Sequence, residues 1–207
     1  MSPLRRLVIA TNNPHKVREI RVILGGLPLE ILDAASVSNP PDPEEDGATL
    51  SENAIIKARA FHEATGEWAL ADDSGLEIDA LGGAPGVLSA RYAGDGCSFA
   101  DNNAKVLRLL HGVPREKRSA RFRCVAALAI GPDLVETFDG TAEGWITTEN
   151  RGQSGFGYDP IFFSPELNKT FAEAAAADKN RVSHRGRAFR AAAERLRALL
   201  EAGSKGG

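Results

Sequence analysis

The sequence has 207 residues, and its 25 basic and 28 acidic side chains leave a formal net charge of −3 at pH 7. A negatively charged chain does not coat nucleic acid, so any phosphate binding must come from local clusters. The 43% hydrophobic content is typical of a globular protein that buries a core. No apolar run is long enough for a membrane span or a signal peptide. Two cysteines without metal-ligand spacing indicate free thiols in a reducing cytoplasm.

The N-terminal region predicts a strand, a polar loop and a helix in succession. Residues 7–10 form a short apolar run, and residues 17–24 carry apolar side chains at helical spacing. A helix N-terminus attracts anions because its unpaired N–H groups and its dipole both favour negative charge. The loop is therefore a candidate phosphate cradle, and an ordinary capped helix is an equal alternative. Its candidate residues are Thr11, Asn12, Asn13, Pro14, His15 and Lys16.

A second strand and an acidic loop precede the next helix. Residues 29–32 predict the strand, and the proline-stiffened loop at residues 39–47 contains Glu44 and Glu45. Acidic loops are usually only solvated, which is the alternative to a metal-binding role. A capping box at Thr49 and Glu52 predicts a helix that continues to about residue 65.

The apolar run at residues 68–71 predicts a strand that ends in an acidic turn at residues 71–75. The turn contains adjacent carboxylates, Asp72 and Asp73, which repel each other and do not suit an apolar strand. Open α/β sheets place ligand sites at the carboxyl ends of their strands, and Mg²⁺ prefers one or two carboxylates together with substrate oxygens. A solvated Asp-Ser-Gly turn is the alternative reading, because these residue types are ordinary turn formers.

The second half of the chain predicts a helix over residues 98–110 and two long strands over residues 119–130 and 134–148. Gly131-Pro132-Asp133 lies between these strands and predicts a hairpin. An alanine-rich helix over residues 187–200 follows.

Two further loops carry unusual side chains. Phe156 lies between two glycines, and an aromatic ring held in this way can stack on a nucleobase; a core aromatic in a bend is the alternative. Lys179, His184 and Arg185 form a cationic cluster, which is otherwise read as a charged helix cap. Together, the phosphate cradle, acidic pair, aromatic ring and cations match the needs of a nucleoside triphosphate with Mg²⁺.

With these motifs in order along nearly the whole chain, the sequence closely resembles the inosine triphosphate pyrophosphatase family. One small departure is Asn150, where the family often carries proline. The motifs that carry the resemblance are residues 11–16, Glu52-Asn53-Ala54, residues 71–76, residues 81–86, Ser89-Ala90-Arg91-Tyr92, residues 155–160 and residues 179–186.

The resemblance implies an enzyme that hydrolyses inosine, deoxyinosine and xanthosine triphosphates (ITP, dITP and XTP) to the monophosphate and pyrophosphate. It implies Mg²⁺ as cofactor, a cytoplasmic homodimer, and no nucleic-acid or membrane partner. The expected fold is α/β and two-lobed, with a long twisted mixed β-sheet flanked by helices and the active site in a cleft between lobes. We expect a single domain over residues 1–207 with a flexible tail from about residue 202. A related pyrophosphatase for modified pyrimidine or methylated nucleotides is the alternative.

The resemblance also assigns roles to residues. Residues 11–16 hold the triphosphate, and Asp73 is the general base. Metal ligands are expected among Asp73, Asp72, Glu44 and Glu45. The like charge of Asp72 should raise the proton affinity of Asp73, which suits a base, whereas a bound metal opposes that shift. The expected nucleotide contacts are Ser74, Phe156, Gly157, Tyr158, Asp159, Lys179, His184 and Arg185.

Overall fold

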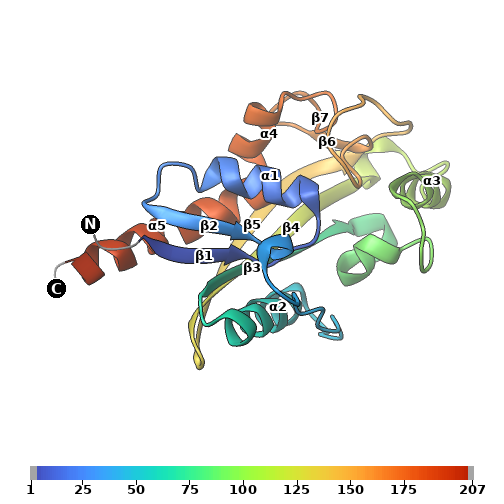
Figure 1. Cartoon of the computed structure of the whole chain (residues 1–207). Helices are drawn as coiled ribbons and strands as arrows, with labels where there is room; N and C mark the ends of the chain where they lie inside the picture. The colour runs from blue at the N-terminus through green and yellow to red at the C-terminus, as the bar shows by residue number, and fades with distance from the viewer. Residues whose placement is uncertain (1–3, 205–207) are drawn as a thin grey trace. The chain divides into compact units, whose positions relative to one another are not determined.

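The computed structural model describes residues 4–204, which form helices around one seven-stranded sheet (Figure 1). The strand order is β2-β1-β3-β4-β5-β6-β7. β1 pairs in parallel with β2 and β3, whereas β6 pairs antiparallel with β5 and β7, so the predicted mixed α/β fold is confirmed. The strands are β1 (Arg5–Ile9), β2 (Leu29–Asp33), β3 (Trp68–Ile78), β4 (Ser119–Gly131), β5 (Leu134–Ile146), β6 (Phe162–Ser164) and β7 (Lys169–Thr170). The helices are α1 (Pro14–Ile23), α2 (Leu50–Thr65), α3 (Phe99–Leu109), α4 (Ala176–Val182) and α5 (His184–Ser204).

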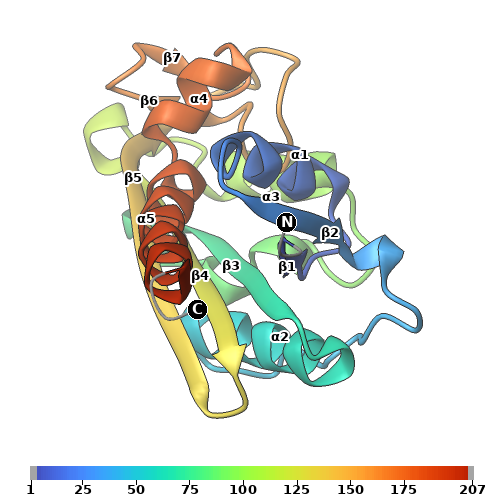
Figure 2. The same ribbon diagram turned by 60° about the vertical axis from the view of Figure 1, so that its left-hand side comes forward.

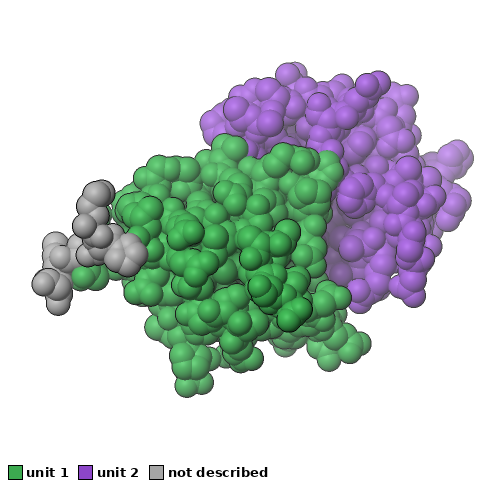
Figure 3. All heavy atoms as spheres, in the orientation of Figure 1, with its two compact units in different colours: residues 1–73, 124–140, 185–207 green, residues 74–123, 141–184 purple. Residues whose placement is uncertain are grey.

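The chain divides into two compact units, which Figure 3 colours separately. Unit 1 takes the chain up to Asp73, residues 124–140 and the chain from Arg185 onward. Unit 2 takes residues 74–123 and 141–184. The long strands β3, β4 and β5 therefore each contribute residues to both units.

In unit 1, helices cover both faces of the sheet. Leu7, Ile9 and Leu70 point to one face, where they pack with buried residues of α1 and α5. Val8, Ala69 and Ala71 point to the other face, where they pack with α2. Figure 1 shows α1 and α2 on opposite sides of β1. This alternation follows from the two-residue period of a strand and fixes which face each later residue of β3 can reach.

Unit 2 has its own apolar core, built largely from aromatic rings. The ring of Phe122 lies 4.6 Å from that of Phe162 and 5.9 Å from that of Phe171. Val106 and Leu110 attach α3 to this core. The loops that carry the aromatic motif therefore pack against a buried apolar core.

The local signals that predicted the helices are present in the structure. Asn13 caps α1, Pro14 takes its first position, and the Thr49–Glu52 capping box opens α2. A capping box from Ser98 and Asp101 opens α3. The predicted hairpin is also confirmed, because β4 ends and β5 begins around Gly131-Pro132-Asp133 (Figure 2).

The prediction of a turn at residues 71–75 is wrong, because β3 continues without interruption to Ile78. Sequence spacing could not reveal that both carboxylates have cationic partners inside the fold. Gly75 is required in this strand because a Cβ there would lie 2.5 Å from the carbonyl oxygen of Gly86.

Three smaller expectations have clear outcomes. Cys97 and Cys124 are both free thiols, as predicted. Residues 202–204 belong to α5, while the remainder of the expected tail lies outside the described residues. No helix within residues 4–204 is long and apolar enough to span a membrane.

Candidate active site

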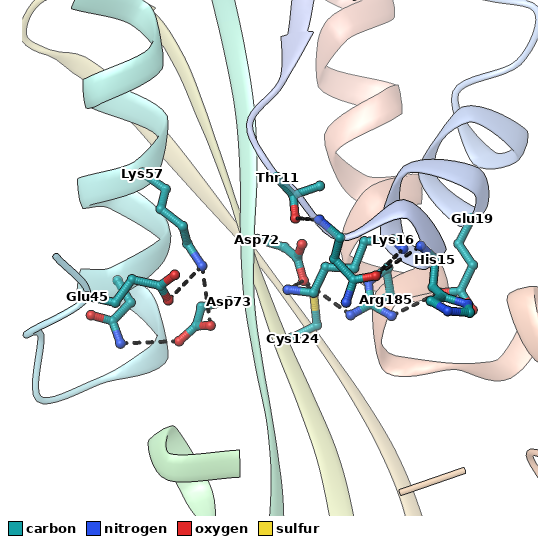
Figure 4. Close-up of polar contacts among 12 residues, drawn as sticks. Thr11, His15, Lys16, Glu19, Glu45, Lys57, Asp72, Asp73, Cys124 and Arg185 are labelled. Atoms are coloured by element: carbon teal, nitrogen blue, oxygen red, sulfur yellow. Dashed lines mark hydrogen bonds and ion pairs between the residues drawn. The ribbon is translucent and has the colours of Figure 1, made fainter. Parts of the chain in front are cut away.

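β3 directs its two adjacent carboxylates to opposite faces of the sheet (Figure 4). Leu70 belongs to the core beneath α1 and α5, so Asp72, two positions later, points to that face. Ala71 belongs to the core beneath α2, so Asp73 points there. The two side chains therefore have separate environments, although they are neighbours in sequence.

The Asp72 carboxylate is fully buried between two cations. Its Oδ2 lies 3.0 Å from Lys16 Nζ and 3.3 Å from Arg185 Nη2, and it accepts a 3.8 Å contact from the Cys124 thiol. The guanidinium of Arg185 also binds Glu19 at 2.8 Å. Burial alone would raise the pKa of Asp72, but Lys16 and Arg185 outweigh it and hold the pKa well below its usual range. Asp72 is therefore ionised at neutral pH.

The Asp73 carboxylate is partly exposed and has weaker partners, which come from α2. Asn53 Nδ2 donates to it at 3.3 Å, and Lys57 Nζ lies 3.4 Å from its Oδ1. Lys57 also binds Glu45 of the acidic loop at 2.9 Å. Burial raises the pKa of Asp73, and Glu45 adds to this effect, while Lys57 opposes it without cancelling it. Asp73 is thus the carboxylate that holds a proton more readily than usual.

The loop after β1 brings Lys16 to Asp72. β1 and β3 are parallel and in register as far as Ile9 and Leu70, so the chain leaves β1 beside the acidic part of β3. Asn13 then accepts hydrogen bonds from the backbone N–H groups of His15 and Lys16 at 2.9 and 3.4 Å. This cap turns the chain into α1 and directs Lys16 back towards the strand.

In unit 2, one carboxylate organises the aromatic loop. Asp159 is buried, and its Oδ2 accepts the Phe156 N–H at 2.9 Å and a bond from Lys179 Nζ at 2.6 Å. The same ammonium lies 4.8 Å from the centre of the Phe156 ring. The Tyr158 hydroxyl donates to the Ser89 carbonyl at 2.9 Å, and burial raises the pKa of Tyr158 above its usual value. The loop thus holds Phe156, Asp159 and Lys179 together.

The structure gives Lys179, His184 and Arg185 different surroundings. Lys179 binds Asp159, whereas the buried ring of His184 stacks on Phe122 at 4.5 Å. Arg185 binds Asp72 and Glu19. Each of the three side chains is therefore engaged by different residues of the fold.

The sequence matches a known protein family. The model of the Ham1 family matches residues 7–195, which is nearly the whole chain. The chain belongs to the Ham1 family.

Individual Ham1 relatives match at high identity. A dITP/XTP pyrophosphatase of Desulforamulus reducens is 50% identical over 94% of this chain and 96% of that protein. One from Bacillus subtilis is 45% identical over 96% of this chain and 98% of that protein. Among solved structures, a HAM1 protein from Coxiella burnetii has a TM-score of 0.84 and 43% identity, over 96% of this chain and 99% of that one.

The side chains of this Ham1 chain can be tested for a fit to a metal ion. No group of three or more His, Cys, Asp or Glu side chains suited to a metal occurs among residues 4–204. Glu45 and Asp73 nevertheless share the Lys57 ammonium, so these two carboxylates already converge on a positive charge (Figure 4). Two carboxylates plus substrate phosphates are a sufficient donor set for Mg²⁺. Asp72 points to the opposite face, and no contact brings Glu44 to this pair.

Sequence reasoning did not select three residues that the structure places beside the acidic pair. Asn53 and Lys57 contact Asp73, and Glu19 binds Arg185. The sequence carried a signal for Asn53 and Lys57, because they are four residues apart and share one face of the predicted helix. Glu19 gave no such signal, since its partner is 166 residues away in sequence.

Proposed function

We propose that this Ham1 protein is a nucleoside-triphosphate pyrophosphatase that hydrolyses ITP, dITP and XTP to the monophosphate and pyrophosphate. The observation that carries the proposal is the Asp73 carboxylate, whose pKa is raised within a cluster that also contains Lys57 and Glu45. The names of the relatives, dITP/XTP pyrophosphatases, supply the substrate class.

Asp73 is proposed to act as the general base. The reaction adds a water oxygen to the first phosphorus and breaks its bond to the oxygen that leaves with pyrophosphate. Asp73 accepts the proton that the water loses, and a raised pKa makes it a better acceptor. Asn53 Nδ2 donates to Asp73 Oδ2, whereas Lys57 Nζ lies beside Asp73 Oδ1. The Asn53 bond therefore fixes the orientation of the Asp73 carboxylate.

Mg²⁺ is the proposed cofactor, and Asp73 and Glu45 are the residues that would hold it. When bound, Mg²⁺ neutralises phosphate oxygens and polarises the attacking water. Lys57 contributes a positive charge at the same place.

The loop at residues 11–16 is proposed to bind the triphosphate through the helix N-terminus and the Lys16 ammonium. The Arg185 guanidinium binds both Asp72 and Glu19. It holds the Asp72 carboxylate in the position where that carboxylate binds and orients Lys16.

The aromatic loop is proposed to bind the nucleobase. Phe156 offers a ring face for stacking, which is worth about 1–3 kcal/mol per base. Lys179 lies over the Phe156 ring and is the proposed contact to the base edge, where a donor aimed at a 6-keto oxygen favours hypoxanthine and xanthine over adenine. Ser74, Gly157, Tyr158, Asp159, His184 and Arg185 remain predicted nucleotide contacts.

The proposal includes a cytoplasmic homodimer, as the family resemblance implies. Light scattering behind a sizing column gives the mass in solution, and a monomer mass would remove this part alone.

The test is product analysis with purified protein and a panel of triphosphates. We expect Mg²⁺-dependent release of pyrophosphate, without orthophosphate, from ITP, dITP and XTP, and at least about 10²-fold lower kcat/KM for ATP. Release of orthophosphate instead would contradict cleavage between the first and second phosphates. Preference for a modified pyrimidine or methylated nucleotide would favour the related pyrophosphatase class.

A further inference from the structure

Helix α3 lies outside every sequence motif that carried the resemblance, yet two of its residues contact the aromatic loop. The ring of Phe99 lies 6.1 Å from the ring of Phe156, tilted by 46°. Asn103 Nδ2 donates to the Gly157 carbonyl at 3.1 Å. Phe99 and Asn103 are four residues apart and therefore lie on one face of α3. One helix face thus touches two successive residues of the loop.

This face of α3 is held firmly. The Ser98 hydroxyl accepts the Asp101 N–H at 3.2 Å, and the Asp101 carboxylate accepts the Ser98 N–H at 2.8 Å, so the first turn is fixed at Phe99. Asn102 attaches the preceding loop by bonds to Ala93 and Ala90 at 2.7 and 3.1 Å. Further along, Val106 is buried in the core of unit 2. The helix is therefore a stable platform for whatever it contacts.

The loop, in contrast, depends on its neighbours for its conformation. Gly157 has a φ of 61°, a region that few other residues adopt, and its carbonyl accepts the bond from Asn103. Lys179 lies over the Phe156 ring, and Phe99 packs against it at a tilt. Phe99 is 46% exposed, so its ring can move with that of Phe156 and is not fixed in a core. These contacts limit how the Phe156 ring can turn and where the Gly157 carbonyl can point.

We propose that Phe99 and Asn103 are positioning residues for the nucleobase site. Phe99 sets the tilt of the Phe156 ring, and Asn103 fixes the Gly157 peptide that follows it. The proposal rests on the proposed function, in which Phe156 stacks on the base. It adds α3 as the element that determines how well the base is held.

The experiment measures steady-state kinetics with ITP and Mg²⁺. Phe99→Ala should raise KM about 3- to 10-fold, the range expected from loss of one aromatic pair, while kcat changes by less than about twofold. Asn103→Ala should raise KM in the same direction. Phe99→Tyr keeps the ring and should restore the wild-type KM. Leu109→Ala is the matched control, because Leu109 is 45% exposed at the opposite end of the same helix.

A second readout separates base binding from general loosening of the fold. Inorganic tripolyphosphate has no base, so its inhibition constant should stay within about twofold of wild type in every variant. An unchanged ITP KM in Phe99→Ala and Asn103→Ala would overturn the proposal. Equal weakening of tripolyphosphate and ITP would also overturn it, because a purely structural role predicts that result. If wild-type protein released no pyrophosphate from ITP, the proposed function itself would fail, which is a distinct outcome.

Discussion

Asp72 and Asp73 are the same residue type one position apart, yet the two faces of β3 treat them in opposite ways. The Asp72 side chain is 0% exposed and lies between Lys16 and Arg185. The Asp73 side chain is 13% exposed and shares a single lysine with Glu45. The pKa of Asp72 is lowered, and that of Asp73 is raised. Because the chemistry is identical, the surroundings alone cause the difference.

This difference indicates a division of labour. A carboxylate whose pKa is lowered is ionised at neutral pH, so it can anchor cations but does not accept a proton there. A carboxylate whose pKa is raised can accept a proton during a reaction. Two neighbouring acids with oppositely shifted pKa values are the arrangement that separates an electrostatic role from acid–base chemistry.

The largest expected effect is on turnover. Asp73→Asn should lower kcat for ITP by about 10³-fold, within the range of general-base removal, while nucleotide binding survives. Because burial raises the pKa of Asp73, its ionised form opposes folding at neutral pH, so this variant should unfold at the same temperature or higher. Rapid-quench kinetics and calorimetry provide the two measurements. A variant that retains most of its kcat would refute the role of Asp73.

The corresponding change on the other face should affect stability first. Asp72→Asn leaves the buried Arg185 and the partly buried Lys16 with less compensating charge and should cost about 3 kcal/mol or more in the free energy of unfolding. Urea denaturation measures it. Asp79→Asn is the control, because Asp79 is a solvent-screened surface carboxylate whose loss should cost less than about 1 kcal/mol. Equal stabilities for the two variants would contradict the anchoring role.

The pH dependence of stability follows from the same shift. The folded pKa of Asp72 lies below the unfolded value of about 3.9, so the ionised group contributes stability that is fully present above that value. The contribution declines as the pH falls below it. Wild-type protein should therefore lose more stability on acidification than Asp72→Asn. Parallel stability curves for the two proteins would show that Asp72 is not the titrating anchor.

A fourth prediction separates the two glutamates of the acidic loop. Glu45→Gln should raise the Mg²⁺ concentration for half-maximal activity by about 10-fold or more. Loss of a residue that supports a metal site lowers metal affinity by a comparable factor. Glu44→Gln should have little effect, because only Glu45 contacts the Lys57 that binds Asp73. Magnesium titrations at fixed ITP distinguish them. The reverse result would exchange their roles.

The smallest expected effect concerns the base itself. Lys57 lowers the pKa of Asp73, so Lys57→Met should move the acidic limb of the kcat/KM profile to higher pH, by about one unit or less. Lys57→Arg keeps the charge and should leave the limb in place. Profiles at saturating Mg²⁺ make the comparison. A shift to lower pH in Lys57→Met would contradict the electrostatic relation between the two side chains.

Much of the fold was predictable because its signals are local. The Thr49–Glu52 capping box, the apolar run at residues 7–10 and the turn at residues 131–133 each specify their element through neighbouring residues. The motifs likewise indicated Lys16, Asp73 and Phe156 as site candidates. Their roles in the site stay predictions.

The course of β3 was not predictable, because its determinants are distant in sequence. Two adjacent carboxylates favour a turn until compensating charges are known, and one of those charges, Arg185, is 113 residues from Asp72. Once the strand continues, alternation sends Asp72 and Asp73 to opposite faces. The sequence therefore indicated the acidic pair, but only the fold shows that its two members have different surroundings.

The most direct test measures the two carboxyl groups themselves. Carbon-detected NMR of the Asp side chains, assigned with Asp72→Asn and Asp73→Asn, gives each pKa during a pH titration. We expect the pKa of Asp73 to lie above the ordinary value of about 3.9 and that of Asp72 to lie well below it. Equal values, or the opposite order, would contradict the division between an anchoring carboxylate and a catalytic base.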